Sequence, residues 1–253
     1  FLSLHRYRGY GAMKFVGLRN YVNILQYKVF WLAVRNTLFY LFLHWAPVIV
    51  ISFSLALVVR TRKIRLQRFL KPIIFMPHMM AIVSASLVWR VIFSTNHGVI
   101  NHLLGTRIGF LEDPLLMKLS VVMLMIWRAL GWFFVVFLAG LTTVSDDLRD
   151  AARIDGASGW QTTTRVVIPI MKPVFLFTFL METINTLKVF TQPNILISGW
   201  LSAPPPAKPV MSIMVDNVKT GFFGMAAASG WLLFIGILAV ALTQLRLFGL
   251  RED

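Results

Sequence analysis

Polar side chains recur inside one of the most apolar stretches of the chain, residues 172–193. Their spacings of four, three, three and four predict one face of a single helix; they are Thr178, Glu182, Asn185, Lys188 and Gln192. Glu182 lies about 15 Å along that helix from its start, near the middle of a membrane. A charged residue there costs about 2.5–3.5 kcal/mol, so the stripe must face protein or water. It either lines a path for a polar solute or bonds neighbouring helices together.

Polar residues in two other apolar stretches are candidates for the same path. Arg128 is a candidate charge partner for Glu182. Asn36 and Tyr40 share one helix face with His44, at spacings of four, and are weaker candidates. These residues are therefore predicted to contribute to one polar path.

Other chemistries find little support in the sequence. No glycine precedes a Lys-Ser or Lys-Thr pair at phosphate-loop spacing, so we do not expect ATP hydrolysis by that route. His97 and His102 fit no zinc spacing. His78 stands among methionines that could bind copper, although methionine packing is far commoner. We therefore expect no catalytic residue, no metal and no cofactor bound by this chain.

The composition indicates an integral membrane protein. Hydrophobic residues make up 57% and charged residues 14% of the 253 residues, whereas roughly a quarter of a soluble domain is charged. The formal net charge is +15, but the basic residues stand beside apolar stretches, which favours a membrane over nucleic acid as the partner. No cysteine is present, which excludes disulfides and thiolate metal ligands.

Five apolar stretches have close to the roughly 20 residues that a helix needs to cross a membrane. They cover residues 31–59, 72–93, 116–143, 172–193 and 226–247. The loop after the first is basic, with Arg60, Arg62, Lys63, Arg65, Arg68 and Lys71 and no acid, so we place it in the cytoplasm. Alternation then puts the link 145–173 inside, and it puts the basic N-terminal segment outside, against the rule.

This topology predicts an all-α membrane protein with three parts. They are an outer N-terminal segment (1–30), a transmembrane domain (31–248) containing the cytoplasmic loop 145–173, and a short cytoplasmic tail (249–253). The odd number of spans also predicts that one more span precedes Phe1.

The link 145–173 carries the densest pattern of helix signals in the chain, SDDLRDAARIDGASGWQTTTRVVIPIMKP. Ser145 can cap a helix whose first turn holds Asp146 and Asp147, where the helix dipole favours negative charge. Gly156 can end that helix in a left-handed conformation that other residues resist. Asp155 is a candidate cap for a second short helix.

That second helix leads to Pro169, which restarts the backbone before the next span. On the first helix, Ala151 and Ala152 form a small, nearly bare patch beside Asp150. Two short helices that meet at a glycine, with alanines exposed, suit insertion into a groove on another protein. We therefore predict a docking element.

The segment DAARIDGASGWQ, with IPIMKP after it, resembles the cytoplasmic signature loop of binding-protein-dependent ABC importer permeases. The likeness is to the carbohydrate-uptake group, which includes the maltose and glycerol-phosphate transporters. Other segments also resemble this family: FVGLRNYVNIL at 15–25, NTLFY at 36–40, residues 73–101 and GMAAASGWLLF at 224–234. The resemblance implies a MetI-like, type I importer permease, a helical bundle whose first span of six would precede Phe1.

By this resemblance, the loop forms coupling helices that sit in a cleft of a cytosolic ATPase subunit. The positions that match are Ala151, Ala152, Asp155, Gly156, Ala157, Pro169 and Pro173, with Asp150 where the family usually has Glu. Thr163 stands where an aromatic residue is customary, which weakens the expected apolar contact. The implied partners are two ATPase subunits that bind ATP and Mg, a different permease chain and an extracytoplasmic solute-binding protein.

The implied function is import of a sugar, oligosaccharide or polyol across the inner (plasma) membrane. The basic N-terminal segment and Lys188 leave an anionic solute open, such as a sugar phosphate or an acidic oligosaccharide. An ion-coupled secondary transporter that uses Glu182 is another alternative, but it leaves the loop 145–173 unexplained. A membrane-anchored scaffold would explain that loop and not the polar stripe.

Overall fold

The computed structural model describes residues 1–61, 67–200 and 202–248. Arg62, Lys63 and Arg65 of the basic loop and the predicted tail 249–253 lie outside these residues. The described chain divides into two compact units. The first comprises Phe1–His44, Met80–Met125 and Thr183–Thr243; the second comprises Trp45–Met79, Ile126–Glu182 and the residues from Gln244 onward.

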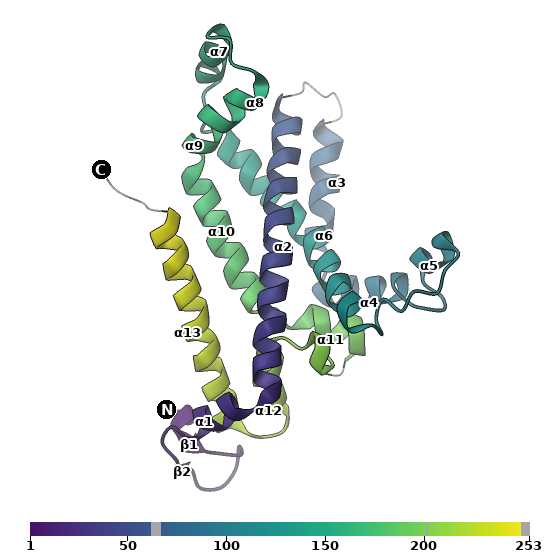
Figure 1. Ribbon diagram of the computed structural model, residues 1–253, viewed down its shortest axis with the longest axis vertical. Coiled ribbons are helices and arrows are strands. Elements are labelled where there is room, and N and C mark those ends of the chain that lie inside the picture. The colour runs from purple at the N-terminus through teal and green to yellow at the C-terminus, as the bar shows by residue number, and fades with distance from the viewer. Residues whose placement is uncertain (62–66, 201, 249–253) are drawn as a thin grey trace. The chain divides into compact units, whose positions relative to one another are not determined.

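Three helices of the described chain are long and apolar enough to cross a membrane (Figure 1). They are α2 (Lys28–Thr61), α6 (Pro114–Leu141) and α13 (Phe223–Phe248). Two further apolar stretches form pairs of helices that each count as one broken span. The first pair is α3 (Gln67–Met79) with α4 (Ile82–Ile92), and the second is the helical run Gly159–Ile170 with α10 (Lys172–Leu187).

The apolar stretch 72–93 is a broken span and not one continuous helix, because the chain leaves the helical conformation at Met80 and Ala81. Pro72 and Pro77 both lie inside α3. Each proline removes a backbone donor and crowds the preceding turn, so this segment holds its helix weakly. Ala81 then has an extended ψ of 131° before α4 begins.

The helix predicted over 172–193 also ends early, at Leu187. A new helix, α11 (Thr191–Ser198), starts four residues later with Pro193 in its first turn. Pro193 has no N–H to donate to residue 189, whereas the first turn of a helix needs no such donor. Lys188 and Gln192 therefore do not share a helix with Glu182, and the predicted five-residue stripe on one helix is wrong.

Phenylalanine packing forms the core of the second unit. Phe53 of α2, Phe137 of α6 and Phe175 of α10 meet pairwise, with ring centroids 4.9–5.4 Å apart. Gly131 lets α6 approach α3, since a Cβ at this position would come within 2.6 Å of the carbonyl oxygen of Ile74. Lipid is as apolar as these side chains, so close packing is what holds the helices together here.

The first unit has its own core around the beginning of α2. Phe30 and Ala33 pack with Ile213 of α12 (Val210–Lys219) and Ala228 of α13. In the same unit α4 packs against α11, and Arg90 of α4 donates to the carbonyl oxygens of Ile195 and Leu196 at 3.3 and 3.4 Å. The carbonyl of Ile195 also accepts from the backbone N–H of Gly199 at 3.1 Å, so Arg90 adds a positive charge at the C-terminal end of α11, where the helix dipole favours it.

The remaining elements are short. In the first unit they are η1 (Leu2–Leu4), β1 (His5–Arg6), β2 (Lys14–Phe15), α1 (Arg19–Gln26), α5 (Val99–Leu104) and η3 (Pro205–Ala207). In the second unit they are α7 (Asp146–Ile154), α8 (Gly159–Thr162), the π-helical turn η2 (Thr163–Val167) and α9 (Ile168–Ile170).

Candidate functional site

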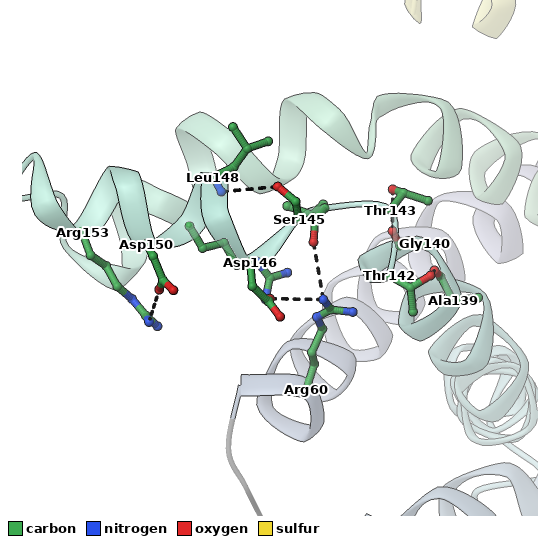
Figure 2. A network of polar contacts seen from close by, with 12 residues as sticks. Arg60, Ala139, Gly140, Thr142, Thr143, Ser145, Asp146, Leu148, Asp150 and Arg153 are labelled. Atoms are coloured by element: carbon green, nitrogen blue, oxygen red, sulfur yellow. Dashed lines mark hydrogen bonds and ion pairs between the residues drawn. The ribbon is translucent and has the colours of Figure 1, made fainter.

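The predicted docking loop begins with the helix that its sequence indicates. Ser145 is the N-cap of α7, and its Oγ accepts a hydrogen bond from the backbone N–H of Leu148 at 3.3 Å (Figure 2). Asp146 and Asp147 lie in the first turn, where the helix dipole favours their negative charge. This start of the loop is as predicted.

Gly156 ends α7 in the predicted left-handed conformation, with φ of +82°. The N–H of Gly156 bonds to the carbonyl of Arg153 at 3.0 Å, and the N–H of Ala157 bonds to that of Ala152 at 2.9 Å. This pair of bonds is the Schellman motif, which satisfies carbonyls at a helix end and requires positive φ at the residue corresponding to Gly156.

Asp155 does not cap the second helix, contrary to the prediction. Ser158 does so, because it forms a capping box with Gln161: Gln161 N–H donates to Ser158 Oγ at 3.3 Å, and Ser158 N–H donates to Gln161 Oε1 at 2.8 Å. The box satisfies two backbone donors reciprocally, whereas Asp155 still belongs to the end of α7. The helical run then bends by 72° against α10 at Met171, two residues after Pro169.

The predicted docking residues lie on the surface of the chain. Asp150, Ala151, Asp155, Gly156 and Pro169 are exposed, and Ala152 and Ala157 are partly exposed. The carboxylate of Asp150 pairs with Arg153 at 3.1 Å, one turn along the same helix (Figure 2). Such an exposed pair contributes about 0.3–0.5 kcal/mol, so it leaves the carboxylate available to another protein.

Sequence reasoning missed the apolar part of this surface. Ile154 is 86% exposed and Trp160 is 77% exposed, with Leu148 also uncovered. These three are the only large apolar residues between Ser145 and Gln161. Large apolar residues in an otherwise polar segment could have indicated an apolar contact surface from the sequence. Trp160 supplies an exposed aromatic side chain one turn before Thr163, the position where the resemblance leads one to expect an aromatic residue.

Arg60, in the last turn of α2, forms hydrogen bonds with the start of the loop 145–173 and with the residue before it. Its Nη2 donates to the carbonyl oxygen of Val144 at 3.4 Å and to Asp146 Oδ1 at 3.3 Å (Figure 2). Arg149 reaches the same carboxylate at 3.9 Å and is buried. Burial lowers the pKa of Arg149, and the nearby charge of Arg60 lowers it further, while Asp146 opposes both effects. The ends of α2 and α6 and the beginning of α7 are thus linked through one carboxylate and one carbonyl.

Two of the predicted path residues are engaged with backbone. The side-chain amide of Asn36 donates to the carbonyls of Pro205 and Lys208 at 2.9 and 3.0 Å, and the hydroxyl of Tyr40 donates to that of Ala207 at 2.7 Å. Both side chains are almost wholly buried. They hold residues 205–208 against α2, and a role in a solute path stays a prediction.

The other path candidates differ in exposure. Glu182 is buried, Asn185 and Lys188 are exposed, and Arg128 and Gln192 are half-buried. Arg128 Nη2 donates to the carbonyl oxygen of His78 at 3.4 Å, and the His78 ring stacks on Trp132 with centroids 5.3 Å apart. The ion pair of Arg128 with Glu182 stays a prediction.

The class of protein follows from comparison with known families. Residues 48–248 match the family described as "Binding-protein-dependent transport system inner membrane component". The chain belongs to this family and is a multi-pass protein of the inner membrane. The predicted family is thereby confirmed.

Particular relatives span nearly all of the chain. The lactose transport system permease protein LacF of Rhizobium radiobacter is 29% identical, over 99% of this chain and 86% of that protein. The trehalose/maltose transport system permease protein MalF of Thermococcus litoralis is 27% identical, over 100% of this chain and 86% of that protein.

Solved structures confirm the predicted importer-permease fold. A bacterial ABC transporter that imports the acidic polysaccharide alginate superposes with a TM-score of 0.83 at 22% identity, covering 94% of this chain and 85% of that chain. The MetNI methionine ABC transporter superposes with a TM-score of 0.61 at 16% identity, covering 87% and 92%.

Proposed function

We propose that this chain is the permease subunit of an ATP-driven importer that carries a carbohydrate into the cytoplasm. The names of its relatives support the substrate class, since they are permeases for lactose and for trehalose and maltose. The loop 145–173 supports the energy source. Its two capped helices expose Ile154 and Trp160 to the solvent, and we take these large apolar side chains as the apolar part of an interface with another protein.

The ATPase in this proposal is a pair of separate cytosolic subunits that bind ATP and Mg, and α7 docks on one of them. A different permease chain completes the membrane path, and an extracytoplasmic binding protein delivers the solute. A related fold supports the last partner, because an alginate transporter has been crystallised with its alginate-pentasaccharide-bound periplasmic protein.

Force from the ATPase would enter the second unit through α7. The Schellman end at Gly156 and the capping box at Ser158 hold the two docking helices in a fixed relation. From α7, the contacts of Arg60 with Val144 and Asp146 lead to α2. In this proposal the loop and the cytoplasmic end of α2 move as one body.

Transport in reconstituted vesicles tests this function against the alternatives. The permease pair, the ATPase and the binding protein are reconstituted, and uptake of maltose or trehalose is followed with ATP or with a proton gradient alone. We expect uptake to require ATP and binding protein together. Uptake driven by the gradient without ATP would establish the secondary transporter instead. Mass spectrometry of the solute that co-purifies with the binding protein separates a neutral carbohydrate from an anionic one.

A further inference from the structure

Two cations face each other in the N-terminal segment without a nearby acid. Strand β1 pairs with β2 in antiparallel register, which places Arg6 directly opposite Lys14. Like charges in that position destabilise a strand pair. No Asp or Glu precedes Glu112 in the sequence, so no acidic side chain of this segment offsets the repulsion.

Arg6 and Lys14 line one pocket together with Arg19 of α1. The pocket has a volume of about 280 Å³, and the beginning of α13 forms its other wall, at Phe222, Gly224 and Met225. Within the described residues, no acidic side chain lines this pocket and none forms an ion pair with these three cations. The positive end of the α13 dipole adds to the same field. Such a pocket attracts an anion.

Specific contacts hold this segment against α13. Asn20 is buried, and its side-chain amide donates to the carbonyls of Ser3 and His5 at 2.8 and 3.0 Å. Gly224 allows the close approach, because a Cβ there would collide with the carbonyl oxygen of His5. These contacts hold the backbone that leads into Arg6 against the beginning of α13, so the strand pair that carries the two exposed cations lies at the pocket.

The pocket lies where two membrane spans begin. Helix α1 ends at Gln26 and the span α2 begins at Lys28, while the span α13 begins at Phe223 beside the pocket. Leu18, the N-cap of α1, and Val22 and Leu25 of α1 follow at spacings of four and three and are 67%, 47% and 40% exposed. An exposed apolar face beside cations is typical of a helix that lies in the lipid head-group layer.

We propose that this pocket binds the phosphate of an anionic phospholipid, with the Leu18–Val22–Leu25 face in contact with the acyl chains. A free phosphate ion would satisfy the cations and leave that apolar face unexplained. A carboxylate of a protein partner would not need the pocket to lie at the start of two spans. The lipid accounts for the charges, the apolar face and the position together.

Native mass spectrometry of the complete transporter in detergent, titrated with phosphatidylglycerol, tests the proposal. The pocket variant is Arg6→Gln/Arg19→Gln, and the control is Arg107→Gln/Lys219→Gln, which removes the same charge from exposed positions of the same unit outside the pocket. One cation near an anionic surface contributes about a fivefold affinity. We therefore expect the pocket variant to bind the lipid roughly 25-fold more weakly and the control to bind it as the wild type does.

Equal binding by all three proteins, or equal loss in both variants, would overturn the proposal. Binding of inorganic phosphate with the same affinity as the lipid would also overturn it, because the apolar face would then contribute nothing. A pocket variant that keeps its lipid but loses affinity for the binding protein would assign the pocket to a protein carboxylate instead. Phosphatidylglycerol should raise the unfolding temperature of the wild type and of the control. The pocket variant should still show an unfolding transition, because it is folded, but the lipid should not shift the temperature of that transition, because the variant does not bind it.

Discussion

Gly156 matters for its backbone conformation and not for space. Its φ is +82°, and a Cβ built there would have nothing within 4 Å. Placing an L side chain in the left-handed region costs roughly 1–2 kcal/mol. The sequence was sufficient to predict this residue, because helix ends of this type select glycine.

Gly156→Ala should loosen the end of α7 and lower solute uptake without preventing membrane insertion. Gly159→Ala is the matched control, since Gly159 lies in the first turn of α8 with ordinary φ and equally open space. Uptake and ATP hydrolysis are measured for both in vesicles. Equal uptake by the two variants would show that the left-handed turn does not contribute to coupling.

Trp160 is predicted to contact the ATPase directly. Its side chain is 77% exposed, so Trp160→Ala should leave the free energy of unfolding almost unchanged. A tryptophan at the centre of an interface contributes about 2 kcal/mol or more, so ATPase affinity should fall at least roughly 30-fold. Trp200→Ala, at a site 68% exposed and outside the loop, should bind ATPase normally. Unchanged affinity of Trp160→Ala would remove Trp160 from the docking surface.

The sequence was sufficient to predict most of the helices but not the positions at which two of them break. The five apolar stretches and the Ser145 cap follow from local composition and spacing. The breaks after Met79 and after Leu187 do not, because a proline is compatible with both a kinked helix and a new one. The capping box at Ser158 was readable from Ser158 and Gln161, but Asp155 offered a competing cap.

At the scale of elements, Arg60 should couple α2 to α7. Arg60→Gln removes the ion pair with Asp146, and the exposure of that carboxylate limits the loss of stability to about 1 kcal/mol. We expect fewer solutes imported per ATP hydrolysed. Arg153→Gln is the control, because its pair with Asp150 lies within α7 alone. Coupling ratios are measured in vesicles, and equal ratios for the two variants would contradict the link.

The sequence also could not show which polar residues of the spans lie on one helix face, because it does not show where the helix ends. Spacing placed Lys188 and Gln192 in line with Glu182, but spacing has meaning only while the helix continues. Asn185 is still on α10 and is exposed. Asn185→Leu should therefore alter the KM or the rate of uptake and leave ATPase binding intact. Wild-type uptake kinetics in this variant would remove Asn185 from the path.

For the whole molecule, family membership establishes the class of protein, and the proposed docking of the loop 145–173 on an ATPase subunit would determine how transport is driven. The family match covers residues 48–248, which include both the loop and the spans on either side of it. The two relatives described above, which match over nearly all of the chain, are permeases for lactose and for trehalose and maltose. Every coupling prediction above depends on the proposed docking of an ATPase subunit on α7.

Maleimide labelling tests that docking most directly, because the chain has no cysteine of its own. Ala151→Cys places one thiol on the exposed face of α7, and Leu103→Cys places one on α5, where the side chain is 78% exposed. We expect that adding the ATPase subunits protects the thiol introduced at position 151 and leaves the one at position 103 fully reactive. Equal labelling at position 151 with and without ATPase, in an assembly that transports, would contradict it.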